Sequence, residues 1–185
     1  MANEAVIYEV ATAEDMLTYS TKPELREISQ YFMRTASQFV QDIQGGKFDE
    51  SFAALYREQA DEQKARYVQL LKLFVEKYGD KKVIITRSPG RVNLMGRHID
   101  HRGGSINVMA TDKDIVFVSA IRDDDEIHIT NVNENFPDKC FSIEKTLGEK
   151  TYEKWLDYLA DERVAKELTA SNGCWSNYVK SAVIK

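Results

Sequence analysis

The sequence lacks the cysteine pattern of a disulfide-rich or zinc-binding domain. Only two of its 185 residues are cysteine, Cys140 and Cys174, and they are far apart, without a CxxC spacing or a nearby pair of histidines. This pattern gives little support to a disulfide framework or a zinc site. We expect both thiols to be reduced and to lie in the core.

Long apolar runs and an excess of basic residues are also missing. No apolar run approaches the roughly 18 residues of a membrane span, and residues 1–10 lack a basic region leading into an apolar stretch. The formal net charge of −5 argues against broad binding to nucleic acid or acidic membranes. We therefore expect a cytoplasmic protein whose partners are small molecules or proteins, with no nucleic acid and no membrane among them.

The chain is 43% hydrophobic, which is enough for one core or two small ones. Before residue 80 the spacing predicts helices, one within residues 21–43 and one within residues 67–78 that ends at Gly79. From Val83 onward the pattern changes to strands. Residues 1–80 are therefore a predicted helical N-terminal extension, and residues 81–185 a second unit.

Four stretches of the second unit have the composition of strands: 83–86, 115–121, 127–130 and a short one including Phe141 and Ile143. The three aspartates at 123–125 are predicted to form a hairpin turn rather than a metal site. Two further helices are expected, one around 155–159 and one over 175–183. The last runs into the end of the sequence without a capping residue, from which we expect an interrupted chain.

Residues 87–110 read RSPGRVNLMGRHIDHRGGSINVMA and combine many charged side chains with glycines and a proline. Glycines let a backbone turn and approach a ligand, and charged groups between them can converge on a polar substrate. The composition alone fits equally well a surface loop whose charges pair with one another.

The order of these residues resembles the galactokinase signature, GRxNLIGEHxDYxGG, of the GHMP kinase superfamily. The segment WSNYVKSAVIK similarly resembles the WxNYVKGV that precedes the phosphate-binding loop in galactokinases. The resemblance implies an α+β fold, with a mixed sheet and helices packed on it. It also implies that residues 81–185 are the N-terminal sugar-binding domain of a sugar kinase, incomplete at its C-terminus.

The resemblance implies roles for individual residues. Arg91 matches the arginine beside the anomeric hydroxyl and is the catalytic candidate, because a fixed guanidinium stabilises charge developing on a moving phosphoryl group. His98 and Asp100 match residues that bind sugar hydroxyls, and His101 and Gly103 complete the substrate-binding set. Alternatively, His98 is a buried histidine that makes its hydrogen bonds within the protein and does not touch the sugar.

Two positions depart from the signature, with Arg97 replacing a glutamate and His101 a tyrosine. That glutamate accepts a hydrogen bond from the C6 hydroxyl in galactokinases, whereas a guanidinium can only donate. Arg97 would suit a carboxylate at C6, as in galacturonate, and HIDHRGG resembles the HIDHQGG of plant galacturonate kinases. Alternatively, Arg97 turns outward or pairs with Asp100, and the sugar is neutral.

The implied cofactors are ATP and Mg²⁺, but a glycine- and serine-rich phosphate loop of the type PxGxGLSSS is missing from this sequence. Trp175 and Tyr178 border the adenine pocket or simply pack a helix. We expect this chain alone to be inactive and the longer protein to be a kinase. A non-catalytic sugar sensor and an interaction module that kept the sugar loop are the alternatives.

Overall fold

The computed structural model describes residues 5–11, 34–96, 99, 103–147 and 160–184. Within these residues a six-stranded mixed sheet has the order β2-β3-β4-β1-β5-β6. The strands are β1 (Ala5–Ala11), β2 (Arg34–Thr35), β3 (Lys82–Met95), β4 (Asn107–Arg122), β5 (Glu126–Asn131) and β6 (Lys139–Ser142). β1 runs parallel to β4, and the other pairings are antiparallel. The predicted α+β class is confirmed.

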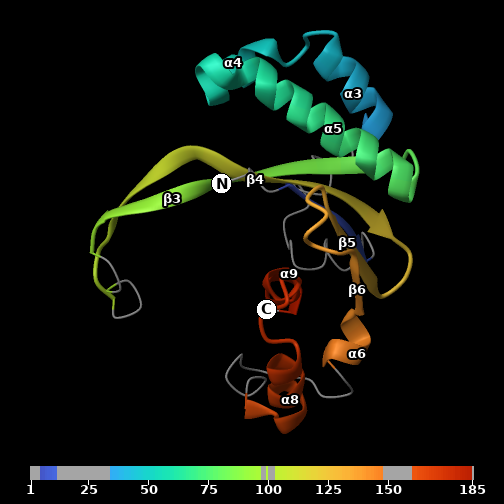
Figure 1. The fold of residues 1–185 in the computed structure, drawn as a ribbon, viewed down its shortest axis with the longest axis vertical. Helices are drawn as coiled ribbons and strands as arrows, with labels where there is room; N and C mark the ends of the chain where they lie inside the picture. Colours follow the sequence, from blue (N-terminus) through green and yellow to red (C-terminus); the bar gives the residue numbers. More distant parts are fainter. Residues whose placement is uncertain (1–4, 12–33, 97–98, 100–102, 148–159, 185) are drawn as a thin grey trace, which may run out of the picture.

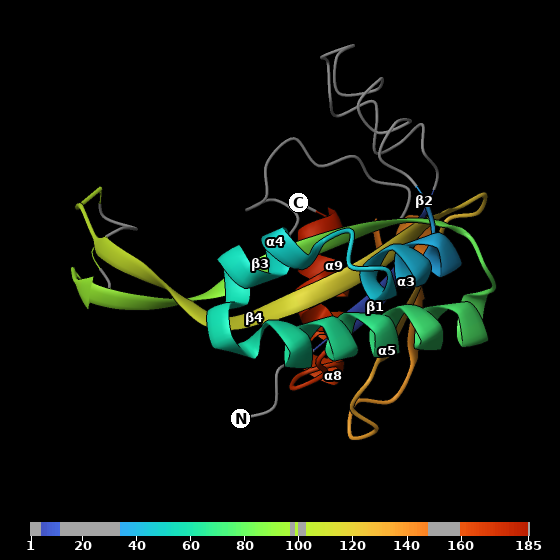
Figure 2. The same cartoon turned by 90° about the horizontal axis from the view of Figure 1, so that it is seen from above.

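Helices lie on both sides of this sheet (Figure 1). One side carries α3 (Ala36–Gln44), α4 (Asp49–Tyr56), the 3₁₀ turn η1 (Arg57–Gln59) and α5 (Ala60–Tyr78). The other side carries α6 (Ile143–Leu147), α8 (Glu162–Ala170) and α9 (Asn177–Ile184). Seen from above, α5 lies over the sheet and runs roughly along β4 (Figure 2). None of these helices is both long and apolar enough to cross a bilayer.

Local sequence explains where the main helices begin and end. Thr35 caps α3 with a complete capping box, in which its hydroxyl accepts from the Gln38 N–H and the Gln38 side chain accepts from the Thr35 N–H. α5 is followed by Gly79 with φ +83°, as the sequence predicted. Of the first predicted helix, the part after residue 35 is confirmed, while Arg34 and Thr35 form β2 instead. Residues 21–33 lie outside the described residues.

The larger core lies between α5 and the sheet. Leu70, Leu71 and Phe74 of α5 are fully buried against Val83 and Val116. Helices before residue 80 share this core with strands after it. The predicted division of the chain at residue 80 stays a prediction. A smaller cluster on the opposite face joins the sheet to α9, and consists of Ile127, Ile129, Phe141 and Val179.

Several expectations about the strands were wrong. Residues 5–11, inside the predicted helical extension, form β1, which pairs with β4 and β5. Residues 123–125 therefore connect two strands separated by β1, and do not close a hairpin. Ile143 begins α6 rather than ending a strand. These pairings are set by contacts between distant parts of the chain, which local patterns do not report.

The C-terminal expectations have mixed outcomes. The helix predicted over residues 175–183 is confirmed as α9, while α8 was not predicted and residues 155–159 lie outside the described part of the chain. Both cysteines are free, in agreement with the sequence. They do not lie in the core, because Cys140 is exposed and Cys174 is half-buried.

Candidate functional site

The charged, glycine-rich stretch lies on a long hairpin formed by β3 and β4. At its base this hairpin is part of the sheet, but β1 pairs with β4 only from Val116 onward, and β2 pairs with β3 only at residues 82–83. The distal part, residues 88–95 and 107–115, is therefore a two-stranded arm that projects from the body (Figure 1). The sequence predicted no strand within residues 87–110, but in the structure only residues 96–106 lie between β3 and β4.

An irregularity in the β3–β4 pairing lies beside the catalytic candidate. The register shifts between Pro89 and Arg91, so that Pro89 pairs with Asp114 and Arg91 with Ala110. Proline lacks the N–H that a regular ladder needs, and is tolerated at such an irregularity. At Gly90 a Cβ atom would lie 2.5 Å from the Thr111 hydroxyl oxygen. Glycine at this position therefore permits the close strand approach that places Arg91.

Glycines also shape the connection at the tip of the arm. Gly96 has φ +85°, and a Cβ atom there would lie 2.7 Å from the backbone oxygen of Ser105. The Ile99 N–H donates to the Gly96 carbonyl at 3.3 Å, and the Gly104 N–H donates to the Ile99 carbonyl at 2.9 Å. Gly103 has φ +78°. The described part of the loop thus turns back on itself.

The predicted site residues fall into two groups. Arg91 is exposed on β3, and Gly103 lies in the loop at the tip, so the structure brings these two to one arm. Arg97, His98, Asp100 and His101 lie outside the described residues. The roles predicted for all six remain predictions.

Trp175 and Tyr178, the two aromatic residues predicted to border the adenine pocket, lie at and just before α9, far from the arm in the sequence. The Trp175 indole N–H donates to the Pro137 carbonyl at 3.2 Å, and its ring packs edge-on against Phe136 with centroids 6.0 Å apart. Tyr178 is 84% exposed on α9. Packing thus accounts for Trp175 but leaves the Tyr178 ring open to a ligand or to another part of the protein.

A buried charge network that the sequence did not reveal fixes the base of the arm. The Asp114 carboxylate on β4 has no exposed surface. It accepts hydrogen bonds from Arg66 of α5 at 2.6 Å, from Tyr56 of α4 at 2.6 Å, and from Arg87 of β3. The Tyr56 hydroxyl also lies 2.8 Å from that of Tyr67. One carboxylate therefore links two helices and both strands of the hairpin.

The electrostatics of this network favour an ionised Asp114. Burial by itself raises the pKa of the carboxyl, but hydrogen bonds from Arg66, Tyr56 and Arg87 outweigh it and hold the pKa below the ordinary value of 3.8. Burial and the neighbouring carboxylate raise the pKa of Tyr56, so its hydroxyl stays protonated and can donate. The Arg87 guanidinium lies 5.1 Å from the centre of the Tyr56 ring.

Arg87 belongs to the charged, glycine-rich stretch in which the site was predicted. In the structure its guanidinium donates to the buried Asp114 carboxylate, four residues before Arg91. Asp114 carried one signal that could have been noticed. It directly precedes the apolar run IVFV, so its side chain was positioned to enter a protein interior. Its partners are distant in sequence, 27 positions away for Arg87 and 48 for Arg66.

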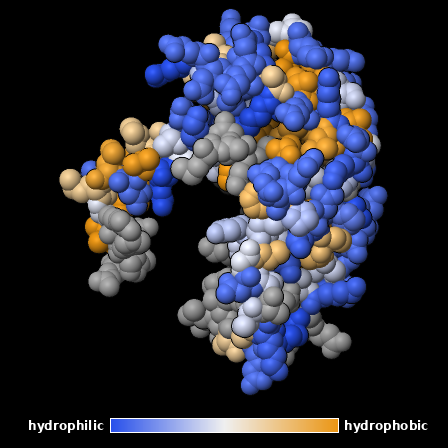
Figure 3. Space-filling view, viewed as in Figure 1, coloured by the Kyte–Doolittle hydropathy of each residue, from blue (hydrophilic) through white to orange (hydrophobic). Residues whose placement is uncertain are grey.

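The arm itself carries an apolar surface (Figure 3). Several of its large hydrophobic side chains are substantially exposed: Val92, Leu94, Met95, Ile99, Val108 and Met109. Leu94 and Met95 are 64% and 70% exposed. The signature therefore stands on a ribbon with several large apolar side chains that are substantially exposed.

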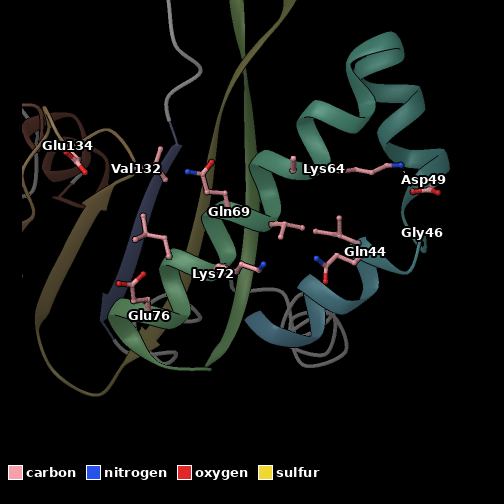
Figure 4. A pocket seen from close by; sticks show the side chains of 13 residues that line it. Gln44, Gly46, Asp49, Lys64, Gln69, Lys72, Glu76, Val132 and Glu134 are labelled. Carbon is pink, nitrogen blue, oxygen red and sulfur yellow. Dashed lines mark ion pairs between the residues drawn. The ribbon is translucent and has the colours of Figure 1, made fainter.

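A groove of about 850 Å³ lies elsewhere, along α3 and α5 (Figure 4). Its lining includes Lys64, Gln69, Lys72 and Glu76 of α5, and the Lys64 ammonium pairs with Asp49 at 2.7 Å. Of the predicted site residues that the structure describes, Arg91, Gly103, Trp175 and Tyr178, none lines this groove. Its polar side chains are those of an ordinary solvated helix surface.

Comparison with protein families identifies the class of site. The galactokinase galactose-binding signature matches residues 72–120, which run from the end of α5 through both strands of the arm. The chain thus carries a galactokinase-type sugar-binding signature, and this match agrees with the resemblance seen in the sequence.

The similarity to individual proteins extends beyond the signature. The chain is 31% identical to a galactokinase of Schizosaccharomyces pombe over 123 residues, which cover 66% of this chain and 21% of that protein. It is 35% identical to a galactokinase of Candida parapsilosis over 98 residues, 51% of this chain and 19% of that protein. A galactokinase of Dictyostelium discoideum is 40% identical over 83 residues, 43% of this chain and 17% of that protein. The chain spans about a fifth of the length of these relatives, and no solved structure matches it.

Proposed function

We propose that this chain is the sugar-binding part of a galactokinase-type kinase, which transfers a phosphoryl group to the anomeric hydroxyl of galactose or of a hexuronic acid such as galacturonate. The observation that carries the proposal is the position of the signature. It occupies a projecting arm on which Arg91 is exposed, and glycines at its tip hold a turned loop.

The arrangement suits the binding of a polar ligand at the tip of the arm. Arg91 follows a register shift that Gly90 permits, so its backbone position is defined by the pairing of β3 with β4. A guanidinium held in this way can stabilise negative charge near the reacting hydroxyl. His98, Asp100, His101 and Gly103 are proposed to hold the remaining hydroxyls, because carboxylate and imidazole groups make strong, directional hydrogen bonds.

The cofactors proposed for the whole enzyme are ATP and Mg²⁺. The residues of this chain do not by themselves form a site for them, because the sequence contains no glycine- and serine-rich phosphate loop. The exposed ring of Tyr178 could border an adenine. The Trp175 ring instead packs against Phe136, and its N–H donates to the Pro137 carbonyl. We therefore assign no step of phosphate transfer to the cofactor-binding residues of this chain.

A hexuronic acid is the proposed finer substrate class. Arg97 stands where the galactokinase signature has a glutamate, and a guanidinium cannot accept a hydrogen bond from a neutral C6 hydroxyl. It can donate two parallel hydrogen bonds to a C6 carboxylate. The supporting observation is that the side chain at this position can only donate hydrogen bonds, where the glutamate of the signature accepts one.

The test is ATP consumption by the longest protein that the gene encodes, measured through ADP formation with galactose, galacturonate and glucuronate offered separately. We expect turnover of a uronate in excess of galactose. Turnover of galactose alone would retain the kinase and overturn the uronate preference. Sugar binding without turnover of any of the three would instead favour a non-catalytic sensor.

Replacing Arg97 by glutamate should reverse the preference. We expect kcat/KM for galacturonate to fall by about 100-fold, since a charge-assisted pair would become a repulsive one, while that for galactose rises. The matched control is Lys113→Glu, which makes the same charge change at an exposed position of β4. Equal substrate ratios in Arg97→Glu and the wild type would exclude Arg97 as the group that recognises C6.

A further inference from the structure

We propose that Glu126, His128 and Cys140 form a binding site for Zn²⁺ at the edge of the sheet, separate from the arm. One ligand atom from each of Glu126, His128 and Cys140 lies within 4.8 Å of the ligand atoms of the other two. Glu126 and His128 are two positions apart on β5, and His128 is directly opposite Cys140 on β6. Alternation along the strands therefore places the three side chains on one face of the β5–β6 pair.

Two of the three separations between the ligand atoms are close to those that zinc requires. Tetrahedral zinc binds nitrogen or oxygen at about 2.0–2.1 Å and sulfur at about 2.3 Å, which puts ligand atoms roughly 3.3–3.6 Å apart. Here the imidazole Nε2 and the carboxylate Oε2 are 2.9 Å apart, and the sulfur and the same oxygen are 3.7 Å apart. Small side-chain movements would admit the ion without a change in the strands.

The chemistry of the set favours zinc over harder cations. A thiolate and an imidazole select borderline or soft ions, whereas calcium and magnesium prefer sites made of oxygen atoms. The thiolate and the carboxylate together balance the charge of Zn²⁺. Cys140 is exposed, and the Glu126 and His128 side chains are 43% and 34% exposed, so water can supply a fourth ligand.

The main positive charge beside the site is already paired. The nearby guanidinium of Arg122 is paired with Asp124, which offsets its positive charge. Because zinc binds cysteine as the thiolate, metal binding should release the thiol proton.

Such a site would tie β6, the edge strand of the sheet, to β5. The sequence contains no recognisable zinc motif at these positions, because the three proposed ligands form neither a CxxC pair nor a pair of histidines. They come together only through strand pairing. The inference is independent of the proposed kinase function, since none of the three residues lies on the arm.

The test uses the full chain, reduced and freed of metal, with Co²⁺ as a spectroscopic substitute for Zn²⁺. We expect an absorption band from charge transfer between the thiolate and cobalt that saturates at one ion per chain and is removed by excess Zn²⁺. Cys140→Ser should abolish the band, whereas Cys174→Ser should retain it. His128→Ala and Glu126→Ala should each weaken binding by about tenfold or more.

A second measurement uses only the wild-type chain, so its result does not depend on whether the variants fold. In the wild-type chain, Zn²⁺ should slow alkylation of Cys140 but not of Cys174, as read by mass spectrometry of the peptides. Absence of the cobalt band, equal protection of both thiols, or full binding by folded His128→Ala would each overturn the proposal.

Discussion

Asp114→Asn is expected to lower the free energy of unfolding by about 3–5 kcal/mol, a large part of the stability of a domain of this size. The substitution keeps the shape of the side chain but removes the charge that Arg66 and Arg87 share. The two guanidinium groups are only 15% and 23% exposed, so water cannot replace the lost partner well. The cost arises from leaving partly buried cations without a counter-charge.

Urea unfolding followed by circular dichroism measures this effect, and Asp112→Asn is the matched control. Asp112 lies two residues away on β4, its side chain is 64% exposed, and its contact with Lys113 is 3.9 Å. The control should change the free energy of unfolding by no more than about 0.5 kcal/mol. A loss of similar size in both variants would show that the network contributes no more than a surface charge.

The same carboxylate should make stability depend on pH. Its pKa is lower in the folded chain than the unfolded value of 3.8, so the unfolded chain binds the proton more readily. The stabilisation is therefore fully present above pH 3.8 and is lost as the pH falls through the lower folded pKa. Unfolding measured between about pH 6 and pH 2 should show the wild type and Asp114→Asn converging at the acidic end. A constant difference would contradict this assignment.

Arg91→Met is expected to lower kcat of the full-length kinase by about 10²–10³-fold, because the charge that stabilises the transition state is removed. This expectation depends on the proposed function. Arg91 is exposed and makes no described contact with the core, so the free energy of unfolding should change little. Steady-state kinetics with the preferred sugar and a parallel thermal melt measure the two quantities.

The control for Arg91 is Lys82→Met, which removes a positive charge from an exposed position at the other end of β3. It should leave kcat within about twofold of the wild type. If Arg91→Met kept wild-type turnover, the arginine would have no part in the transition state. If it lost turnover only through a lower melting temperature, its role would be structural.

The features that the sequence predicted well are those encoded locally. The apolar stripe of α5 and the glycine after it are set by helical spacing and by the ease with which glycine adopts positive φ. The helix over α9 follows the same logic. The signature could be recognised because its glycines and charges occupy one continuous run of the chain, which the family comparison also detects.

The features that the sequence did not reveal depend on long-range pairing. Residues 5–11 form a strand between β4 and β5, although they come from the part of the chain read as helical. Asp114 gains its importance from residues of α4, α5 and β3 that are distant in the sequence. The proposed zinc ligands likewise meet only across β5 and β6. In each case the residues that come into contact are far apart in the sequence and meet only in the folded chain.

Because the arm is long, a small rotation at its base moves the tip, where the sugar site is proposed, by a larger distance. From Pro89, which pairs with Asp114, to Met95 the ribbon spans six residues, or about 20 Å at the rise of a strand. A displacement of 1 Å at a catalytic group can cost about 100-fold in rate. Over this length, 1 Å corresponds to a rotation of only about 3° at the base. The Asp114 network therefore sets an angular tolerance, because the stiffness of a few buried hydrogen bonds limits how accurately the loop at the tip of the arm is positioned.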